Sequence, residues 1–111
     1  MQKTNDYLTL PLKPTFNHFQ KYVENLEDIR GFSNNNILQN CLNLGEEVGE
    51  LFKAVRKEQK MKIDNNSKIG TIEEELADIF IYLCSIANRY SIDLEQAFRN
   101  KESINKTRNW S

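Results

Sequence analysis

Four stretches of the chain carry apolar residues at the spacing of a helix. A helix turns by about 100° per residue, so side chains three and four positions apart line one face. This spacing predicts helices over about residues 16–29, 37–58, 72–90 and 94–107. No stretch alternates apolar and polar residues as a strand would, so the pattern predicts an all-α chain.

Residues that cap helices stand at the predicted ends. Thr15 precedes the first helix, and Gly31 follows it as a residue that readily takes the left-handed conformation. Asn36, Thr71 and Asp93 precede the other three helices. Each is followed three residues later by Gln or Glu, which is the spacing of a capping box.

The length favours one domain over residues 1–111, with a polar lead-in at 1–15 and a helical core at 16–110. We expect a four-helix, bundle-like fold in which two long antiparallel acidic helices pack with two shorter ones. The third helix is the most apolar, and we expect it to be the central buried element, including Leu76 and Leu83. A chain this short buries a modest core, and the apolar flanks beside the acidic residues predict a homodimer or homotetramer.

The composition narrows the classes of function. The 15 Lys and Arg residues nearly balance the 16 Asp and Glu residues, which does not indicate a nucleic-acid polymer as partner. The N-terminal residues are polar, and no apolar run approaches the ~20 residues that span a bilayer. We therefore expect a cytoplasmic protein without membrane contact, in which Cys41 and Cys84 are reduced core thiols.

Two of the predicted helices carry a pair of carboxylates beside their apolar stripe. Glu47 and Glu50 lie at roughly −60° and −120° from the first residue of the stripe in the second helix. Glu75 and Asp78 take the same angles in the third helix. If the helices pack together, the four carboxylates converge, and their repulsion calls for a cation. Oxygen ligands alone select a hard ion, Mg²⁺ or Mn²⁺.

The acidic pattern resembles a known signature. It reads Glu46-Glu47-x-x-Glu50, then 24 residues, then Glu75-x-x-Asp78. This resembles the motif of the MazG-like nucleoside triphosphate pyrophosphohydrolases, which belong to the all-α NTP pyrophosphatase group. Either half of the motif alone is common on solvated helices, whereas both halves in this order are fairly specific.

The end of the chain carries a second point of resemblance. Lys101-x-x-x-Asn105-Lys106-x-Arg108-x-Trp110 is similar to the C-terminal substrate segment of the same family. With this tail included, the resemblance covers roughly residues 16–110. The tail also reads as an ordinary basic helix end that is stabilised by the helix dipole.

The resemblance implies an enzyme that cleaves a (d)NTP to the (d)NMP and pyrophosphate, by attack of water at the α-phosphorus. Such an enzyme would remove aberrant or surplus nucleotides, a house-cleaning role. The resemblance implies Mg²⁺ ligands at Glu47, Glu50, Glu75 and Asp78, the same four carboxylates. Glu46 neighbours Glu50 and is the candidate for orienting or deprotonating the water, although it also reads as a surface glutamate.

Candidate substrate contacts fall into two groups. The tail offers cationic or amide groups for phosphate oxygens at Lys101, Asn105, Lys106 and Arg108. We expect the first two and Arg108 to share one helix face. Lys57 lies beside Glu50 on the second helix and joins this group. The resemblance implies base contacts from the first helix, where we take the polar candidates His18 and Gln20, although His18 also reads as a solvated surface histidine.

Two alternatives compete with the hydrolase. A catalytically inactive helical module could use the fold for nucleotide binding or protein interaction, although the presence of all five acidic positions argues against it. A di-iron bundle would need Glu-x-x-His pairs, and His18 is the chain's sole histidine. Gly45 and Gly49 inside the second helix admit two readings: room for a close neighbour, or tolerated glycines that each cost ~1 kcal/mol.

Overall fold

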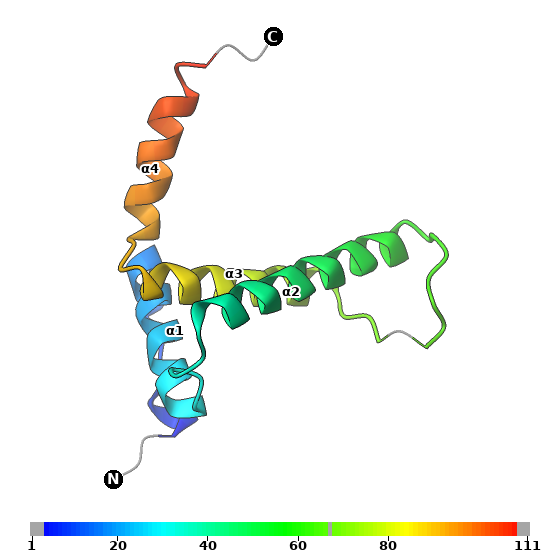
Figure 1. The fold of residues 1–111 in the computed structure, drawn as a ribbon, viewed down its shortest axis with the longest axis horizontal. Helices are drawn as coiled ribbons and strands as arrows, with labels where there is room; N and C mark the ends of the chain where they lie inside the picture. Colours follow the sequence, from blue (N-terminus) through cyan, green and yellow to red (C-terminus); the bar gives the residue numbers. More distant parts are fainter. Residues whose placement is uncertain (1–3, 67, 109–111) are drawn as a thin grey trace. The chain divides into compact units, whose positions relative to one another are not determined.

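The computed structural model describes residues 4–66 and 68–108, and every regular element in these ranges is helical (Figure 1). A short 3₁₀ helix, η1, precedes the four α-helices. The elements are η1 (Asn5–Tyr7), α1 (Phe16–Arg30), α2 (Ile37–Glu58), α3 (Ile72–Arg89) and α4 (Leu94–Asn105). The predicted all-α class and its four helices are confirmed, but α4 ends at Asn105, two residues before the predicted end at Thr107.

The predicted caps form where the sequence placed them. Gly31 adopts the left-handed conformation with φ of 81°, and its N–H donates to the Glu27 carbonyl. At the start of α1, the Thr15 N–H donates to His18 Nδ1 at 2.9 Å. The side chains of Asn36, Thr71 and Asp93 each accept the backbone N–H three residues later. Local residues therefore satisfy backbone groups at the helix ends.

The chain forms two compact units, one made of residues 1–34 and 87–111 and the other of residues 35–86. We call them the first and second units. The first contains η1, α1, the end of α3 and α4, and the second contains α2 and most of α3. None of the helices in the described part of the chain combines the length and apolar character needed to cross a bilayer.

Gln20 connects the helices of the first unit. Its buried side-chain amide donates to the Ile92 carbonyl at 2.7 Å and to Asn88 at 3.2 Å. Its side-chain oxygen accepts the Leu94 N–H at 3.0 Å, at the beginning of α4. These bonds fix α1 against the turn between α3 and α4, over a core that includes Val23.

The second unit is an antiparallel helix pair. Asn40, early in α2, donates from Nδ2 to Ser85 Oγ, late in α3, at 3.0 Å, and both residues are buried. Cys84 is fully buried, and burial raises the pKa of its thiol to about 11. The thiol therefore stays protonated at neutral pH.

Three expectations about the core are wrong. Leu76 and Leu83 are 52% and 43% exposed, and Cys41 is exposed as well. The reason is geometric, because two packed helices bury only the sides that face each other. An apolar stripe that is wider than this contact leaves its outer residues open.

Candidate metal centre and active site

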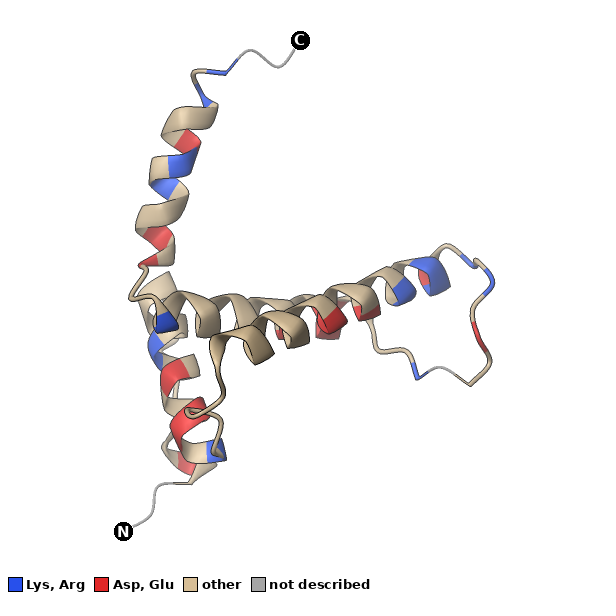
Figure 2. Cartoon of the chain, in the orientation of Figure 1, with Lys and Arg blue, Asp and Glu red and all other residues tan. Residues whose placement is uncertain are grey.

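Three carboxylates from α2 and α3 converge in the second unit. Glu47, Glu75 and Asp78 each place one oxygen so that the three atoms lie within 4.8 Å of one another. Figure 2 shows the acidic residues of α2 and α3 in red, where the two helices run side by side. The antiparallel packing produces this meeting, because it brings the middle of α2 to the first turns of α3. We call these three residues the acidic cluster.

The acidic cluster is buried on one side and open on the other. Glu75 is 7% exposed, Glu47 is half-buried and Asp78 is exposed. The loop before α3 closes over Glu75, and a Cβ placed on Gly70 would collide with Glu75 Oε1. Gly70 therefore lets the backbone approach the carboxylate more closely than another residue would permit.

The electrostatics of the acidic cluster favour a positive charge. The pKa of Glu47 is raised from 4.5 to about 7, chiefly by burial, and also by a hydrogen bond to Glu75. The charges of Asp78, Glu75 and Glu50 raise it further. Protonated Glu47 donates the hydrogen bond, so one proton relieves the repulsion at neutral pH. A hard divalent cation with oxygen ligands would serve the same purpose, and the donor set fits such an ion.

The fourth predicted ligand stands apart from the other three. Glu50 pairs with Lys53, with 3.6 Å between Oε1 and Nζ, and the acidic cluster does not include it. Its charge nevertheless raises the pKa of Glu47, so it lies within electrostatic range. The predicted neighbour Glu46 is exposed, and its charge acts on Tyr82.

Tyr82 is a feature of the site that the sequence analysis missed. Burial raises the pKa of its phenol most, followed by the charges of Glu47, Asp78 and Glu46, while a hydrogen bond with Asn43 opposes the rise. A phenol with a raised pKa stays protonated and is an O–H donor beside the carboxylates. Helical spacing could have revealed it, because Tyr82 follows Asp78 by four residues and Asn43 precedes Glu47 by four.

The candidate tail residues lie in the first unit. Lys101 and Asn105 are on α4, whereas Arg108 lies beyond its end and donates its backbone N–H to the Asn105 carbonyl at 3.1 Å. The prediction that Arg108 shares a helix face with the other two is therefore wrong, because the helix stops at Asn105. Lys106 is the exposed C-cap residue of α4. Trp110 lies outside the described residues.

The remaining candidates occupy different surroundings. His18 is exposed and takes part in the cap of α1, and the side chain of Gln20 is engaged in the bonds to α4 described above. Lys57 lines a cavity of about 630 Å³ in the second unit. Gly70 and Thr71 line the same cavity, so Lys57 stands near the loop that closes over Glu75.

Comparison with known families identifies a matching domain family. The model of the MazG nucleotide pyrophosphohydrolase domain matches residues 35–109. This span holds both acidic motifs and most of the basic tail, and it begins after α1, so His18 and Gln20 fall outside it. No curated protein matches the chain.

We predict that divalent-metal affinity rises with pH up to about 7 and levels off above it, because Glu47 must lose its proton to bind a cation. The folded pKa lies above 4.5, so Glu47 stabilises the metal-free fold most at low pH. This contribution is lost as the pH rises through about 7. Calorimetric titration with Mg²⁺ and thermal unfolding across this range measure both effects. Glu47→Gln should remove most of the pH dependence of both metal affinity and stability. An unchanged pH profile in that variant would show that Glu47 is not the titrating group.

We also predict that Gly70→Ala weakens metal binding by on the order of tenfold, because the new Cβ displaces the Glu75 carboxylate. The control is Asn66→Ala, which alters an exposed, uncharged residue of the same loop. The control should keep its metal affinity within about twofold. Equal affinity in the two variants would show that the loop does not position Glu75.

Proposed function

Because the chain belongs to the MazG nucleotide pyrophosphohydrolase family, we propose that it hydrolyses a (d)NTP to the (d)NMP and pyrophosphate. The observation that carries the proposal is the convergence of Glu47, Glu75 and Asp78, since three carboxylates at this distance are a poor arrangement for stability alone. In the cell, the enzyme would remove aberrant or surplus nucleotides.

The proposal assigns a hard divalent ion, Mg²⁺ or alternatively Mn²⁺, to the acidic cluster together with Glu50. When bound, such an ion supplies charge neutralisation for the phosphates and lowers the pKa of a bound water. The half-buried Glu47 and buried Glu75 give the site its low-dielectric side, which strengthens the attraction for a cation. Exposed Asp78 leaves the other side open to a substrate.

The residues around the cluster have separate roles in the proposed reaction. Water attacks the α-phosphorus, the bond to the bridging α–β oxygen breaks, and pyrophosphate leaves with the bonding electrons. Glu46 is proposed to accept the proton of the attacking water, because its exposed carboxylate stands next to Glu50 and acts on Tyr82. Tyr82, with its phenol protonated, is proposed to donate a hydrogen bond to a substrate oxygen.

The remaining substrate contacts are proposed from the family resemblance and from residue chemistry. Lys57 and the tail residues Lys101, Asn105, Lys106 and Arg108 would contact phosphate oxygens, for which guanidinium and ammonium groups are suited. His18 and Gln20 are proposed to face the base. The Gln20 side chain already bonds to the Ile92 carbonyl and the Leu94 N–H, so it would have to contact the base in addition to these bonds.

We also propose that the enzyme is a homo-oligomer, a dimer or tetramer built on the outer face of α2. Leu42, Gly45, Gly49 and Phe52 share one side of this helix, and Leu42 and Phe52 are 64% and 61% exposed. In the sequence, Leu42 and Phe52 lie five residues on either side of Glu47, and Gly45 and Gly49 lie two residues on either side of it. An antiparallel α2 from a second copy would set each Leu42 against a Phe52, with glycines at the crossing. Such self-complementarity is what a two-fold interface requires.

We predict that Asp78→Asn keeps a normal fold but lowers Mg²⁺-dependent turnover by on the order of a hundredfold or more, because the cluster loses a ligand charge. Pyrophosphate release from a panel of NTPs and dNTPs measures the loss. The control Asp28→Asn alters an exposed residue of α1 and should retain activity. Full turnover in Asp78→Asn would exclude the acidic cluster as the metal site, and no turnover by the unmodified protein would favour the inactive module.

For the interface, we predict that Leu42→Glu lowers the oligomeric state, because a charge buried at the crossing is costly. Light scattering during size-exclusion chromatography measures the mass in solution. Leu12→Glu introduces the same charge at a fully exposed position in the lead-in and should leave the mass unchanged. A monomeric unmodified protein, or an unchanged mass in Leu42→Glu, would refute the interface.

A further inference from the structure

A line of polar pairs runs along the contact between α2 and α3. The helices are antiparallel, so a step of three or four residues along α2 corresponds to an equal step back along α3. The first pair is Asn40 and Ser85, whose side chains are joined at 3.0 Å. The next pair, three residues on, is Asn43 and Tyr82, which are hydrogen-bonded as well. Four residues further along each helix lie two members of the acidic cluster, so the polar line leads into the proposed active site.

The polar line becomes more open as it approaches the acidic cluster. Asn40 and Ser85 are buried, whereas Asn43 and Tyr82 are half-buried. The next position on α3 along this line is the exposed Asp78. A buried polar bond serves the alignment of the two helices. A bond at the edge of an open site also determines where its side chains point toward a ligand.

Asn43 is the donor in its bond with Tyr82. The bond lowers the pKa of the phenol, as a bond donated to the phenol oxygen does, because it stabilises the phenolate. The charges of Glu47, Asp78 and Glu46 act on the same phenol and attract its O–H hydrogen. A phenol carries a single O–H and can also accept a bond at its oxygen. Accepting from Asn43 therefore leaves the O–H for an acceptor at the carboxylates.

We propose that Asn43 is a positioning residue, which holds the Tyr82 phenol so that its O–H reaches an oxygen of a phosphate bound at the acidic cluster. The role in turnover rests on the proposed function, in which this phosphate belongs to the (d)NTP. A donor that is already oriented stabilises developing charge better than one that must turn during the reaction. Without Asn43, the phenol oxygen loses the contact that fixes its direction.

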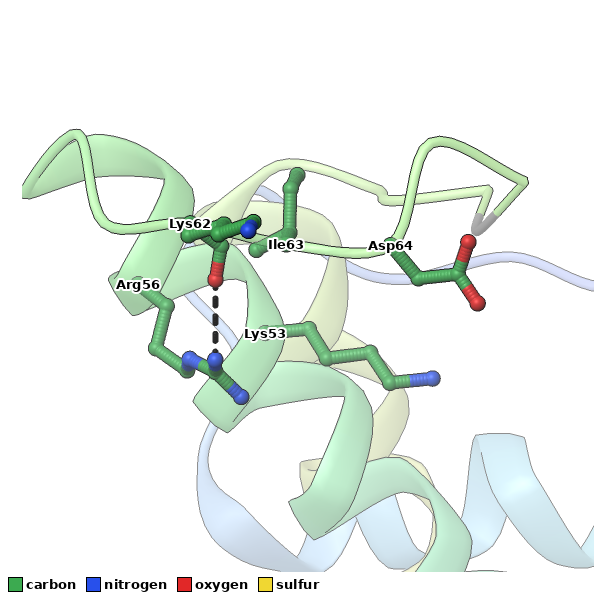
Figure 3. Close-up of a pocket in the computed structure, with 5 residues that line it drawn as sticks. All are labelled: Lys53, Arg56, Lys62, Ile63 and Asp64. Atoms are coloured by element: carbon green, nitrogen blue, oxygen red, sulfur yellow. Dashed lines mark hydrogen bonds between the residues drawn. The ribbon is translucent and has the colours of Figure 1, made fainter.

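A different bond at the end of α2 provides a control. Arg56 donates from Nη2 to the Lys62 carbonyl oxygen at 2.9 Å, beside a cavity that both residues line (Figure 3). Arg56 follows Glu47 by nine residues, which places it about 180° around the helix. Its bond supports α2 without facing the acidic cluster, so its loss reports general loosening of the helix.

Fluorine NMR tests the hydrogen bond in the full chain, labelled with 3-fluorotyrosine and kept in EDTA. The Tyr82 signal, one of four, is the one that Tyr82→Phe removes. Asn43→Leu keeps a branched side chain but removes the donor. It should shift the titration of the Tyr82 signal to higher pH, because the phenolate loses a stabilising bond. Arg56→Gln should leave this titration in place, and an unchanged titration in Asn43→Leu would overturn the proposal.

Turnover of NTPs with Mg²⁺ tests the role of the bond. Tyr82→Phe and Asn43→Leu should each lower kcat/KM by on the order of tenfold, because a donor is lost or misplaced. The double variant should match Tyr82→Phe within about twofold, since Asn43 acts only through the phenol. Asn25→Leu alters an exposed residue of α1 and should keep the original kcat/KM.

The double variant distinguishes positioning from a structural effect. A second full loss of kcat/KM when Asn43→Leu is added to Tyr82→Phe would overturn the proposal, because Asn43 would then act on the alignment of the helices. Asn43→Ala makes the same comparison without adding apolar bulk. If the Tyr82 signal responds to the loss of Asn43 but the unmodified protein hydrolyses no NTP, the proposed function fails and the placement of the phenol by Asn43 stands.

Discussion

The mutual repulsion of three carboxylates is the constraint on which the second unit depends. Packing of α2 against α3 holds Glu47, Glu75 and Asp78 together, and the pKa of Glu47 is raised first by burial and then by the hydrogen bond to Glu75 and the neighbouring negative charges. A folded chain tolerates such a cluster only when other contacts compensate for it. The helix caps and the packing around the fully buried Cys84 contribute to this compensation. The strain is concentrated where a cation would relieve it.

The charges of α2 serve the fold and the proposed chemistry at once. Cationic side chains in the last turn of a helix interact favourably with its dipole, and Arg56 and Lys57 stand there. Lys57 also lines the cavity of about 630 Å³ beside the loop over Glu75. Cationic residues that could bind phosphates are therefore already favoured at this helix end by the helix dipole.

The helices and much of the acidic cluster were predictable, because both depend on local patterns. Periodicity and capping residues fix the helix ends, and helical angles place Glu47 and Asp78 on facing shoulders. The missed features arise from contacts between segments. The burial of Glu75 depends on where the loop at Gly70 comes to rest, and the burial of Tyr82 and its hydrogen bond with Asn43 depend on the packing of α3 against α2.

The buried bond between Asn40 and Ser85 determines how far α3 can slide along α2. An apolar contact between two helices tolerates sliding, whereas a polar pair in the interior is satisfied at one alignment only. A slip of one turn, about 5.4 Å, would carry Glu75 and Asp78 out of reach of Glu47. Leucine or alanine at both positions would therefore give a more stable helix pair that binds its ion more weakly. This polar pair therefore maintains the register of the two helices as well as their contact.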